Sequence, residues 1–472
     1  MNIRILRVLA ACVLLPLAGC AGAPGDAAAP AAPSTVNVTL TAEDKAVEID
    51  GKTLQARVFN GAFAAPTIRV RPGDSLDVEL VNQLDAPANL HFHGMHVSPQ
   101  GDSDNIFRQT PPGATEHYSL QIPPDHEPGL YWYHSHIHGM SEGQVFGGLS
   151  GMLVVEGLTD LLPDPIQGAT EQYLALRDFQ VQDGAIPADN IDSGAPTTRV
   201  VNGEVDPRMT IAPGETQVWH VANIGADIWY DVELTGHRMW VIAEDADPVW
   251  EVWEAEHLVM PPGKRYEVLV QGAAPGTYEL RTRAYNQGTT GDQYPEARLA
   301  TLVSEGAAVE RAELPTSLIP ERDLRTEPVA QDRRIVFTEK NAANEFFIDG
   351  KQFDPTRIDV TPTVGTVERW TIVNQTQEQH PFHIHINDFQ VVSIDGRPYD
   401  ARGHQDTVPV PQGGEVMILN PFDDFTGKYV FHCHILAHED LGMMAVVDVL
   451  NSEGQSESAP VTHGGHTPAP TG

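Results

Sequence analysis

Residues 71–82, RPGDSLDVELVN, join a tight turn to a short strand that ends in an asparagine. Pro and Gly ahead of a run rich in Leu and Val indicate a β-strand entered through a turn. Asn60-Gly61, a pair that favours hairpin turns, comes shortly before it. No stretch of the 472 residues has the pattern of a long amphipathic helix. The sequence therefore predicts an all-β protein built from antiparallel sandwiches or barrels.

This pattern of turn, strand and asparagine occurs three times. The second copy runs from Asn202-Gly203 to Asn223, and the third from Asp349-Gly350 to Asn374. Three β units of similar length follow, with joins near residues 160 and 310. The predicted domains cover residues 36–160, 161–310 and 311–450.

The first twenty residues predict export. Arg4 and Arg7 precede an apolar run that is too short to cross a bilayer as a helix. The sequence LAGC at residues 17–20 then resembles the end of a lipoprotein signal peptide, residues 1–20. We expect Cys20 to be the acylated first residue of the mature chain. Ordinary cleavage nearby, with Cys20 unmodified, is the alternative.

Composition limits the partners and the location. An Ala/Pro-rich tether, residues 21–35, follows Cys20, and a Pro/Ser/Thr/Gly-rich tail, residues 451–472, should be disordered. The net charge of −36 repels nucleic acid and anionic membranes. We therefore expect no nucleic-acid partner and contact with a membrane only through the N-terminal lipid. The chain should be an exported monomer of the cell envelope, in the periplasm or at the cell surface.

Cysteine usage excludes a disulfide framework. Of the three cysteines, Cys12 leaves with the signal peptide and Cys20 is the predicted lipidation site, so only Cys433 remains in the domains. A lone internal thiol is either buried filler or part of a reactive site.

Histidines occur two residues apart at matched places in the chain. Residues i and i+2 of a strand point to the same face, so each pair presents two imidazoles together. In the first and third units a pair begins nine residues after the repeated asparagine, whereas the middle unit has Val232 and Leu234 there. Two domains facing each other would supply eight nitrogens, enough for one copper with two histidines and two coppers with three each. The eight residues are His91, His93, His134, His136, His383, His385, His432 and His434.

Cys433 lies between His432 and His434, so its side chain should point to the opposite face of that strand and bind a different metal. Its candidate partners are His380, His438 and Met443. Two imidazoles, a thiolate and a distant thioether form the ligand set of a blue-copper electron-transfer site. Zinc or purely structural histidines are the alternatives, but zinc has no use for the cysteine and methionine together. An electron accepted by this copper could pass through the cysteine and along the backbone to the flanking histidines.

At these residues the sequence resembles the multicopper oxidases, the family of the laccases and their bacterial relatives. The resemblance extends from about residue 36 to 450 and implies three cupredoxin-like Greek-key domains, with a copper cluster between the first and the third. The segments that carry it are His91-Phe-His-Gly, Tyr133-His-Ser-His136, His380-Pro-Phe-His-Ile-His385 and residues 432–443, HCHILAHEDLGM.

The resemblance implies four coppers per chain: one type 1, one type 2 and two type 3. His91 and His383 would hold the type 2 copper. The type 3 pair would be held by six histidines, whose division between the two coppers stays open: His93, His134, His136, His385, His432 and His434. The type 1 copper would be held by His380, Cys433, His438 and Met443, and His438 would receive electrons from the reductant.

Two carboxylates fall where the family places groups that handle protons. Asp102 lies eleven residues after His91, and Glu439 directly follows His438. Reduction of dioxygen to water consumes protons, so each carboxylate is expected to relay them. The alternative for each is to orient a ligand or a water molecule.

The resulting functional prediction is a laccase-like oxidase that takes electrons from phenols or similar organic reductants and passes them to dioxygen. A cuprous or ferrous ion oxidase is the alternative within the same chemistry. Relatives with that role often carry a methionine-rich insertion near the blue copper, and the ten methionines of this chain are scattered. An alternative from another class is a non-catalytic copper-binding protein of the envelope, but such relatives have lost copper ligands that this chain keeps.

Overall fold

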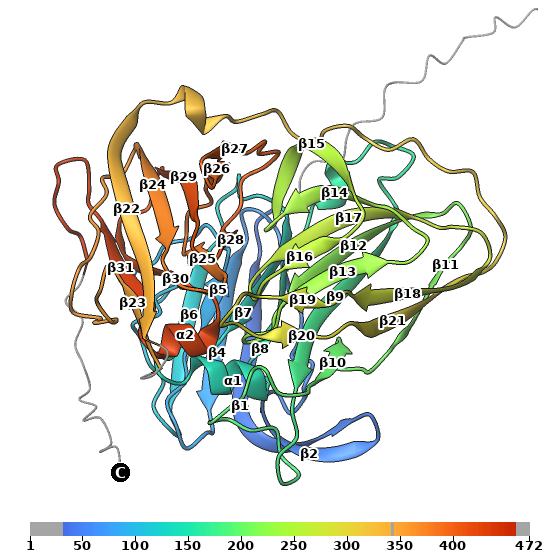
Figure 1. The fold of residues 1–472 in the computed structure, drawn as a ribbon, viewed down its shortest axis with the longest axis horizontal. Coiled ribbons are helices and arrows are strands. Elements are labelled where there is room, and N and C mark those ends of the chain that lie inside the picture. The colour runs from blue at the N-terminus through green and yellow to red at the C-terminus, as the bar shows by residue number, and fades with distance from the viewer. Residues whose placement is uncertain (1–31, 341–343, 459–472) are drawn as a thin grey trace, which may run out of the picture. The chain divides into compact units, whose positions relative to one another are not determined.

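Two four-stranded sheets form the first part of the chain, shown in blue to cyan in Figure 1. One has the order β2-β1-β4-β6 and the other β3-β8-β7-β5. Alternating side chains of these strands, such as Leu76, Val78 and Leu80, enclose an apolar core. The strands are β1 (Thr35–Ile49), β2 (Lys52–Phe59), β3 (Ile68–Val70), β4 (Ser75–Asn82), β5 (His91–His93), β6 (Thr115–Gln121), β7 (Gly129–His134) and β8 (Ser150–Val155).

The middle part, green to yellow in Figure 1, has a six-stranded sheet (β10-β9-β12-β17-β14-β15), a five-stranded sheet (β11-β21-β18-β13-β16) and the small pair β19-β20. These strands are β9 (Thr170–Phe179), β10 (Thr198–Val201), β11 (Arg208–Ile211), β12 (Thr216–Asn223), β13 (Tyr230–Leu234), β14 (Met239–Glu244), β15 (Asp247–Ala255), β16 (Leu258–Met260), β17 (Arg265–Gln271), β18 (Gly276–Thr282), β19 (Tyr285–Asn286), β20 (Gln293–Tyr294) and β21 (Ala297–Ser304).

The last part, orange to red, pairs a six-stranded sheet (β23-β22-β24-β29-β26-β27) with a four-stranded one (β28-β25-β30-β31). Each of these larger sheets draws its strands from one part of the chain only. The strands are β22 (Val329–Lys340), β23 (Glu345–Ile348), β24 (Thr366–Asn374), β25 (His380–Ile384), β26 (Gln390–Ile394), β27 (Arg397–Pro398), β28 (Thr407–Val410), β29 (Glu415–Phe422), β30 (Gly427–Cys433) and β31 (Met444–Val449).

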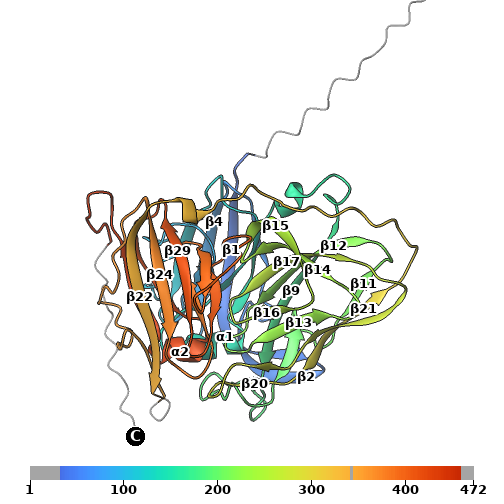
Figure 2. The same ribbon diagram turned by 45° about the horizontal axis from the view of Figure 1, so that its top comes forward.

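Short helices lie at the ends of these sandwiches. Helix α1 (Ser141–Gly147) follows β7, and α2 (Leu436–Asp440) follows β30. The two lie side by side in Figures 1 and 2, joined by hydrogen bonds from the backbone N–H groups of Ser141 and Glu142 to the Asp440 carboxylate. Single 3-10 turns occupy Leu158–Leu161 and Leu324–Thr326.

The three repeated asparagines make the same hydrogen bonds in each part. The side-chain oxygens of Asn82, Asn223 and Asn374 each accept a backbone N–H two residues further on, at 2.9–3.1 Å. Each side-chain nitrogen donates to a carbonyl four or five residues on, at 2.7–2.8 Å. All three side chains are buried. The asparagine thus satisfies the backbone of the turn that leads into β5, β13 or β25, which explains the repeat seen in the sequence.

The structure, a computed structural model, describes residues 32–340 and 344–458. The predicted signal peptide, Cys20 and most of the tether lie outside the described residues, as does the tail from residue 459. Residues 451–458, the start of the predicted tail, are described, and Ser456 and Ser458 both donate hydrogen bonds to Asp448. Among the described helices, none has the length and hydrophobicity needed to cross a membrane.

Candidate metal centres

Strand pairing brings the predicted histidines into register. In the first domain β5 pairs with β7 so that His91 lies opposite His134, and in the third β25 pairs with β30 so that His383 lies opposite His432. Within each i, i+2 pair the ring centroids are 5.2–5.7 Å apart, as expected for side chains on one face of a strand. All eight side chains belong to residues that are at most 2% exposed.

The first and third domains interleave these rings. His91 of β5 stacks on His385 with centroids 3.7 Å apart, and His93 stacks on His383 at 3.9 Å. Neither stack could form inside a single domain. The eight imidazoles therefore make one buried cluster at the junction of the two terminal domains.

Ring nitrogens in the cluster face one another. The Nε2 atom of His432 lies 3.4 Å from Nε2 of His136 and 3.2 Å from Nε2 of His385. The Nδ1 atom of His93 lies 3.2 Å from Nε2 of His434. Other buried ring nitrogens have no hydrogen-bond partner among the described residues: Nε2 of His91, His134 and His383, and Nδ1 of His136, His385 and His434.

Within the part of the chain that the structure describes, the imidazoles of the cluster leave six buried ring nitrogens without a hydrogen-bond partner. Burial first, and then repulsion between neighbouring rings, holds the pKa of His91, His93 and His434 well below the usual range. Such rings are uncharged at neutral pH, and the converging nitrogens present lone pairs. Buried polar atoms without partners are rare in proteins. A set of neutral, converging imidazoles is the donor set that metal ions such as copper bind, so the residues fit a metal cluster.

The opposite nitrogen of several rings is held by an oxygen. Nδ1 of His134 donates to the Ser135 carbonyl and Nδ1 of His432 to the Cys433 carbonyl, each at 3.0 Å. Nδ1 of His383 donates to the Asp406 carbonyl at 2.9 Å. Such bonds fix the tautomer and the direction of a ligating ring.

Asp104, rather than Asp102, is the carboxylate beside His91. Its oxygens lie 3.0 and 3.1 Å from Nδ1 of His91, and burial raises the pKa of Asp104 to about 8. Asp102 is exposed, and the contact with His91 is made by Asp104. The loop between β5 and β6 has no regular periodicity, so spacing alone could not separate two aspartates only two residues apart.

Glu439 reaches the cluster from α2. Its side chain is buried, with Oε2 3.2 Å from Nδ1 of His432 and Oε1 3.4 Å from Nδ1 of His136. Ser141 of α1 donates a hydrogen bond to Oε1 at 3.0 Å. Burial, and then the charge of Asp440, raises the pKa of Glu439 well above its usual range. This carboxyl group thus contacts one histidine from each terminal domain.

A second donor set lies on the other face of β30. The Sγ atom of Cys433 is 3.5 Å from Nδ1 of His380 and 3.7 Å from Nδ1 of His438, and these two nitrogens are 3.1 Å apart. Burial raises the pKa of the Cys433 thiol well above its usual range, so ionisation needs a nearby cation. A bound metal would supply that charge. Two imidazoles converging on one thiol fit a blue-copper site.

Backbone and side-chain contacts hold this second set. Met443 is buried, accepts a hydrogen bond from the Cys433 N–H and donates one to the His438 carbonyl. Nε2 of His380 bonds to the Thr376 hydroxyl at 2.8 Å. The His438 ring stacks on Phe346, with centroids 4.0 Å apart.

His438 forms the accessible edge of the second set. Its side chain is 12% exposed, whereas the side chain of His380 is fully buried. The Glu378 carboxylate lies 3.6 Å from Nε2 of His438. Sequence reasoning did not identify Glu378, although it lies only two residues before His380.

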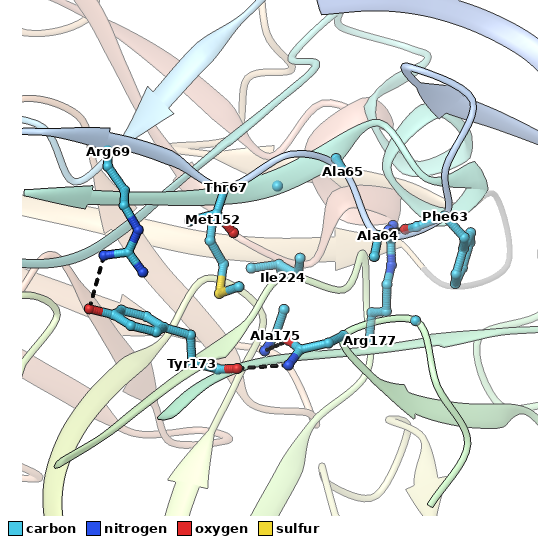
Figure 3. A pocket seen from close by; sticks show the side chains of 13 residues that line it. Phe63, Ala64, Ala65, Thr67, Arg69, Met152, Tyr173, Ala175, Arg177 and Ile224 are labelled. Carbon is cyan, nitrogen blue, oxygen red and sulfur yellow. Dashed lines mark hydrogen bonds between the residues drawn. The ribbon is translucent and has the colours of Figure 1, made fainter. Parts of the chain in front are cut away.

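A separate cleft of about 280 Å³ opens between the first and middle domains (Figure 3). At its ends Arg69 lies over the Tyr173 ring and Arg177 over the Phe63 ring. None of the donors named above lines it. The cleft is therefore distinct from both metal centres.

Comparisons with known proteins agree with this geometry. Family models described as multicopper oxidase match residues 41–160, 157–307 and 326–453. A multicopper oxidase of Staphylococcus aureus is 27% identical over 412 residues, which cover 83% of this chain and 83% of that protein.

Two solved structures are also similar. A multicopper oxidase of Campylobacter jejuni, described as a metallo-oxidase, has a TM-score of 0.79 and 27% identity, covering 89% of this chain and 92% of its own. A laccase-like multicopper oxidase of the lignin-degrading bacterium Ochrobactrum sp., described as active towards lignin model compounds and lignosulfonate, has a TM-score of 0.75 and 25% identity, covering 89% and 100%. The predicted fold class, three cupredoxin-like β-sandwich domains, is confirmed.

Proposed function

This chain belongs to the multicopper oxidase family of copper-dependent oxidoreductases that use dioxygen, and we propose that it is a laccase-like member. In this proposal, phenols or similar organic molecules lose single electrons at a type 1 copper. The electrons reduce dioxygen to water at a three-copper cluster. The observation that carries the proposal is that one strand, β30, bears donors of both centres on its two faces.

The distances support a division of the cluster ligands. His136, His385 and His432 converge through their Nε2 atoms and would hold one type 3 copper. His93 and His434 face each other and, with His134, would hold the second. The remaining two, His91 and His383, would hold the type 2 copper.

Copper, when bound, supplies the one-electron chemistry at the first site and the reduction of dioxygen at the second. The chain supplies positions and routes. The His438 edge meets the reductant, while burial of His380 and Cys433 excludes water from the rest of that site. Cys433 is bonded through the backbone to His432 and His434, so the two centres are joined by a short covalent path.

We propose that Glu439 delivers protons to the cluster. Its carboxyl oxygens contact Nδ1 of His432 and of His136, and the Ser141 hydroxyl connects it to α1. Glu439→Gln keeps the shape of the side chain and removes its acid function. We expect full copper content but oxygen reduction slower by about 10²-fold, measured by oxygen uptake and copper analysis. Unchanged turnover with all coppers present would remove the relay.

The open edge of His438 supports organic reductants. It is flanked by Phe346, and the methionines of the chain are scattered outside Met443-Met444. A soft cuprous ion would favour several thioether ligands. Phenols need only contact with the edge of the ring and a group nearby to accept a proton.

Oxidation of cuprous or ferrous ion is the second candidate. The Glu378 carboxylate beside Nε2 of His438 is a suitable ligand for ferrous ion, the harder of the two. The Campylobacter jejuni protein described as a metallo-oxidase is also similar over 89% of this chain.

One experiment separates these candidates. Oxygen uptake by the copper-loaded protein is measured with 2,6-dimethoxyphenol, cuprous ion and ferrous ion, in the wild type and in Glu378→Gln. We expect the phenol to be fastest and to be affected little by the substitution. A phenol that is inert, together with rapid metal-ion oxidation that depends on Glu378, would support the second candidate. No oxygen uptake with any reductant would support a non-catalytic copper-binding protein.

We also propose export and lipid attachment at Cys20, from the signal-like sequence alone. Cys20→Ser should move the protein from the membrane fraction to the soluble fraction. An unchanged distribution would contradict lipid attachment.

A further inference from the structure

The middle domain approaches the histidine cluster through one turn. Pro261-Pro262-Gly263-Lys264 joins β16 to β17, and Gly263 donates its N–H to the carbonyl of the repeated Asn223 at 3.0 Å. Gly263 has φ +87°, a conformation that favours glycine. A Cβ at this position would lie 3.0 Å from atoms of both His93 and His434. The backbone of the middle domain therefore packs directly against one cluster histidine from each terminal domain.

Arg265, two residues after Gly263, places a buried cation beside the cluster. Arg265 is fully buried, and its guanidinium donates to both carboxylate oxygens of Asp406, at 2.9 and 2.7 Å. It also donates to the Leu130 carbonyl of the first domain and the Asp245 carbonyl of its own. One side chain thus connects all three domains.

Asp406, which Arg265 contacts, also contacts two histidines of the cluster. Its Oδ1 lies 3.2 Å from Nε2 of His93, and its carbonyl accepts from Nδ1 of His383 at 2.9 Å. A buried carboxylate is stable only with a partner, and Nη1 of Arg265 serves both oxygens of Asp406 while Nε and Nη2 hold the guanidinium to the Leu130 and Asp245 carbonyls. The position of Asp406 therefore depends on Arg265.

We propose that the middle domain, although it supplies no metal ligand, positions His93, His383 and His434 through Gly263 and Arg265 and so sets how firmly the cluster retains copper. This inference rests on the proposed function because it takes the eight histidines as copper ligands. Gly263 and Arg265 act here as positioning residues that touch neither dioxygen nor reductant.

Gly263→Ala tests the packing contact, with Gly113→Ala as the matched control. Gly113 lies in the equivalent turn of the first domain, Pro111-Pro112-Gly113, with φ +75° and its N–H bonded to the Asn82 carbonyl. A Cβ there meets no atom within 4 Å. Both substitutions impose similar backbone strain, but only Gly263→Ala pushes on the histidines.

We expect Gly263→Ala to lose non-blue copper to a chelator at concentrations about 10–100-fold lower than the wild type requires, with the blue absorption retained. Gly113→Ala should hold copper like the wild type. Equal retention in the two variants would overturn the packing claim.

Arg265→Lys tests the carboxylate contact, with Arg177→Lys as the control. Arg177 is also a buried arginine of the middle domain that bonds to first-domain carbonyls, those of Phe63 and Val145. Lysine keeps the charge but cannot donate to Asp406, Leu130 and Asp245 from one rigid planar group. We expect only Arg265→Lys to change the electron paramagnetic resonance spectrum of the non-blue copper and to weaken its retention about 10-fold.

The outcomes separate the two proposals. If the wild type binds only a single blue copper, the proposed cluster itself fails. If the wild type holds a full set and both Gly263→Ala and Arg265→Lys hold it equally well, only the positioning role fails. If Arg265→Lys does not fold, as judged by circular dichroism, Gly263→Ala still decides the question.

Discussion

Strands β13 and β25 occupy equivalent places in the middle and third domains but carry different chemistry. Each follows its repeated asparagine by the same interval, with Val232 and Leu234 in β13, His383 in β25 and His385 directly after β25. All four residues are at most 1% exposed. The same backbone position therefore accommodates either two apolar side chains or two imidazoles. The identity of these two side chains decides whether this strand can supply metal ligands.

Buried histidine is not by itself the difference. His220 in β12 of the middle domain is as buried as the cluster histidines, but its Nε2 bonds to Glu171 at 2.9 Å and its Nδ1 lies 3.8 Å from Glu267. Burial alone lowers the pKa of His220, but these two carboxylates outweigh burial and raise it. His220 has a carboxylate near each ring nitrogen and no other imidazole among its contacts with the described residues, and its pKa is raised. His91, His93 and His434 instead face other imidazoles, and burial together with those rings lowers their pKa.

The largest effect is expected when the histidine pair of the third domain is replaced by the apolar pair of β13. His383→Val with His385→Leu should leave the fold intact, because β13 shows that this pair packs in the same frame. Each substitution removes one ligand from a different copper, so the cluster should not form. Oxygen reduction should then fall by about three orders of magnitude or more. Blue absorption should persist. Copper analysis, absorption spectra and oxygen uptake measure these outcomes, and a variant that still reduces dioxygen would contradict the assignment.

Asp104 offers a smaller effect in the first domain. Asp104→Asn weakens the bond that fixes His91, so we expect copper retention to fall about 10-fold or more. Asp102→Asn, two residues away and exposed, is the control and should match the wild type. Chelator titration distinguishes them, and equal losses in the two variants would contradict the assignment to Asp104.

The reverse substitution, histidine in place of an apolar residue of β13, tests whether a single imidazole is enough to bind copper. Val232→His places one imidazole in the apolar core of the middle domain. We expect no additional copper and a free energy of unfolding lower by about 1–3 kcal/mol, measured by urea denaturation. Uptake of an extra copper ion would show that a single strand position is enough to make a site.

His220→Gln should have the smallest effect and a defined pH dependence. The raised pKa means that the ion pairs of His220 with Glu171 and Glu267 stabilise the fold fully below the unfolded pKa of about 6.5 and are lost as pH rises through the folded value. The substitution should therefore cost about 1 kcal/mol at low pH and less in alkaline solution. Urea denaturation of metal-free protein at the two pH values measures this. A cost that grows with pH would contradict the ion pairs.

Features set by local periodicity were predictable from the sequence. Alternation along a strand placed His432 and His434 on one face and Cys433 on the other, and the spacing from Asn82 and Asn374 matched the two ligand strands. These relations span few residues and follow from strand geometry.

Long-range features were not predictable from the sequence. Asp104 was missed because an irregular loop has no period to count. Asp406, Gly263 and Arg265 meet the cluster across domain boundaries, and no spacing within one domain indicates such contacts. Glu378 lies close to His380 in sequence, but only the fold shows that its carboxylate turns toward His438.

Because side chains alternate between the two faces of β30, the two metal centres depend on whether an insertion in this strand has an odd or an even number of residues. Inserting one residue between Phe431 and His432 would rotate every following donor to the wrong face, exchanging thiol and imidazole between the two centres. Inserting two would restore the faces and only shift the strand by one pleat. Length variation in this strand should therefore be tolerated in even steps, if at all, whereas the loops that enter it can change by any number.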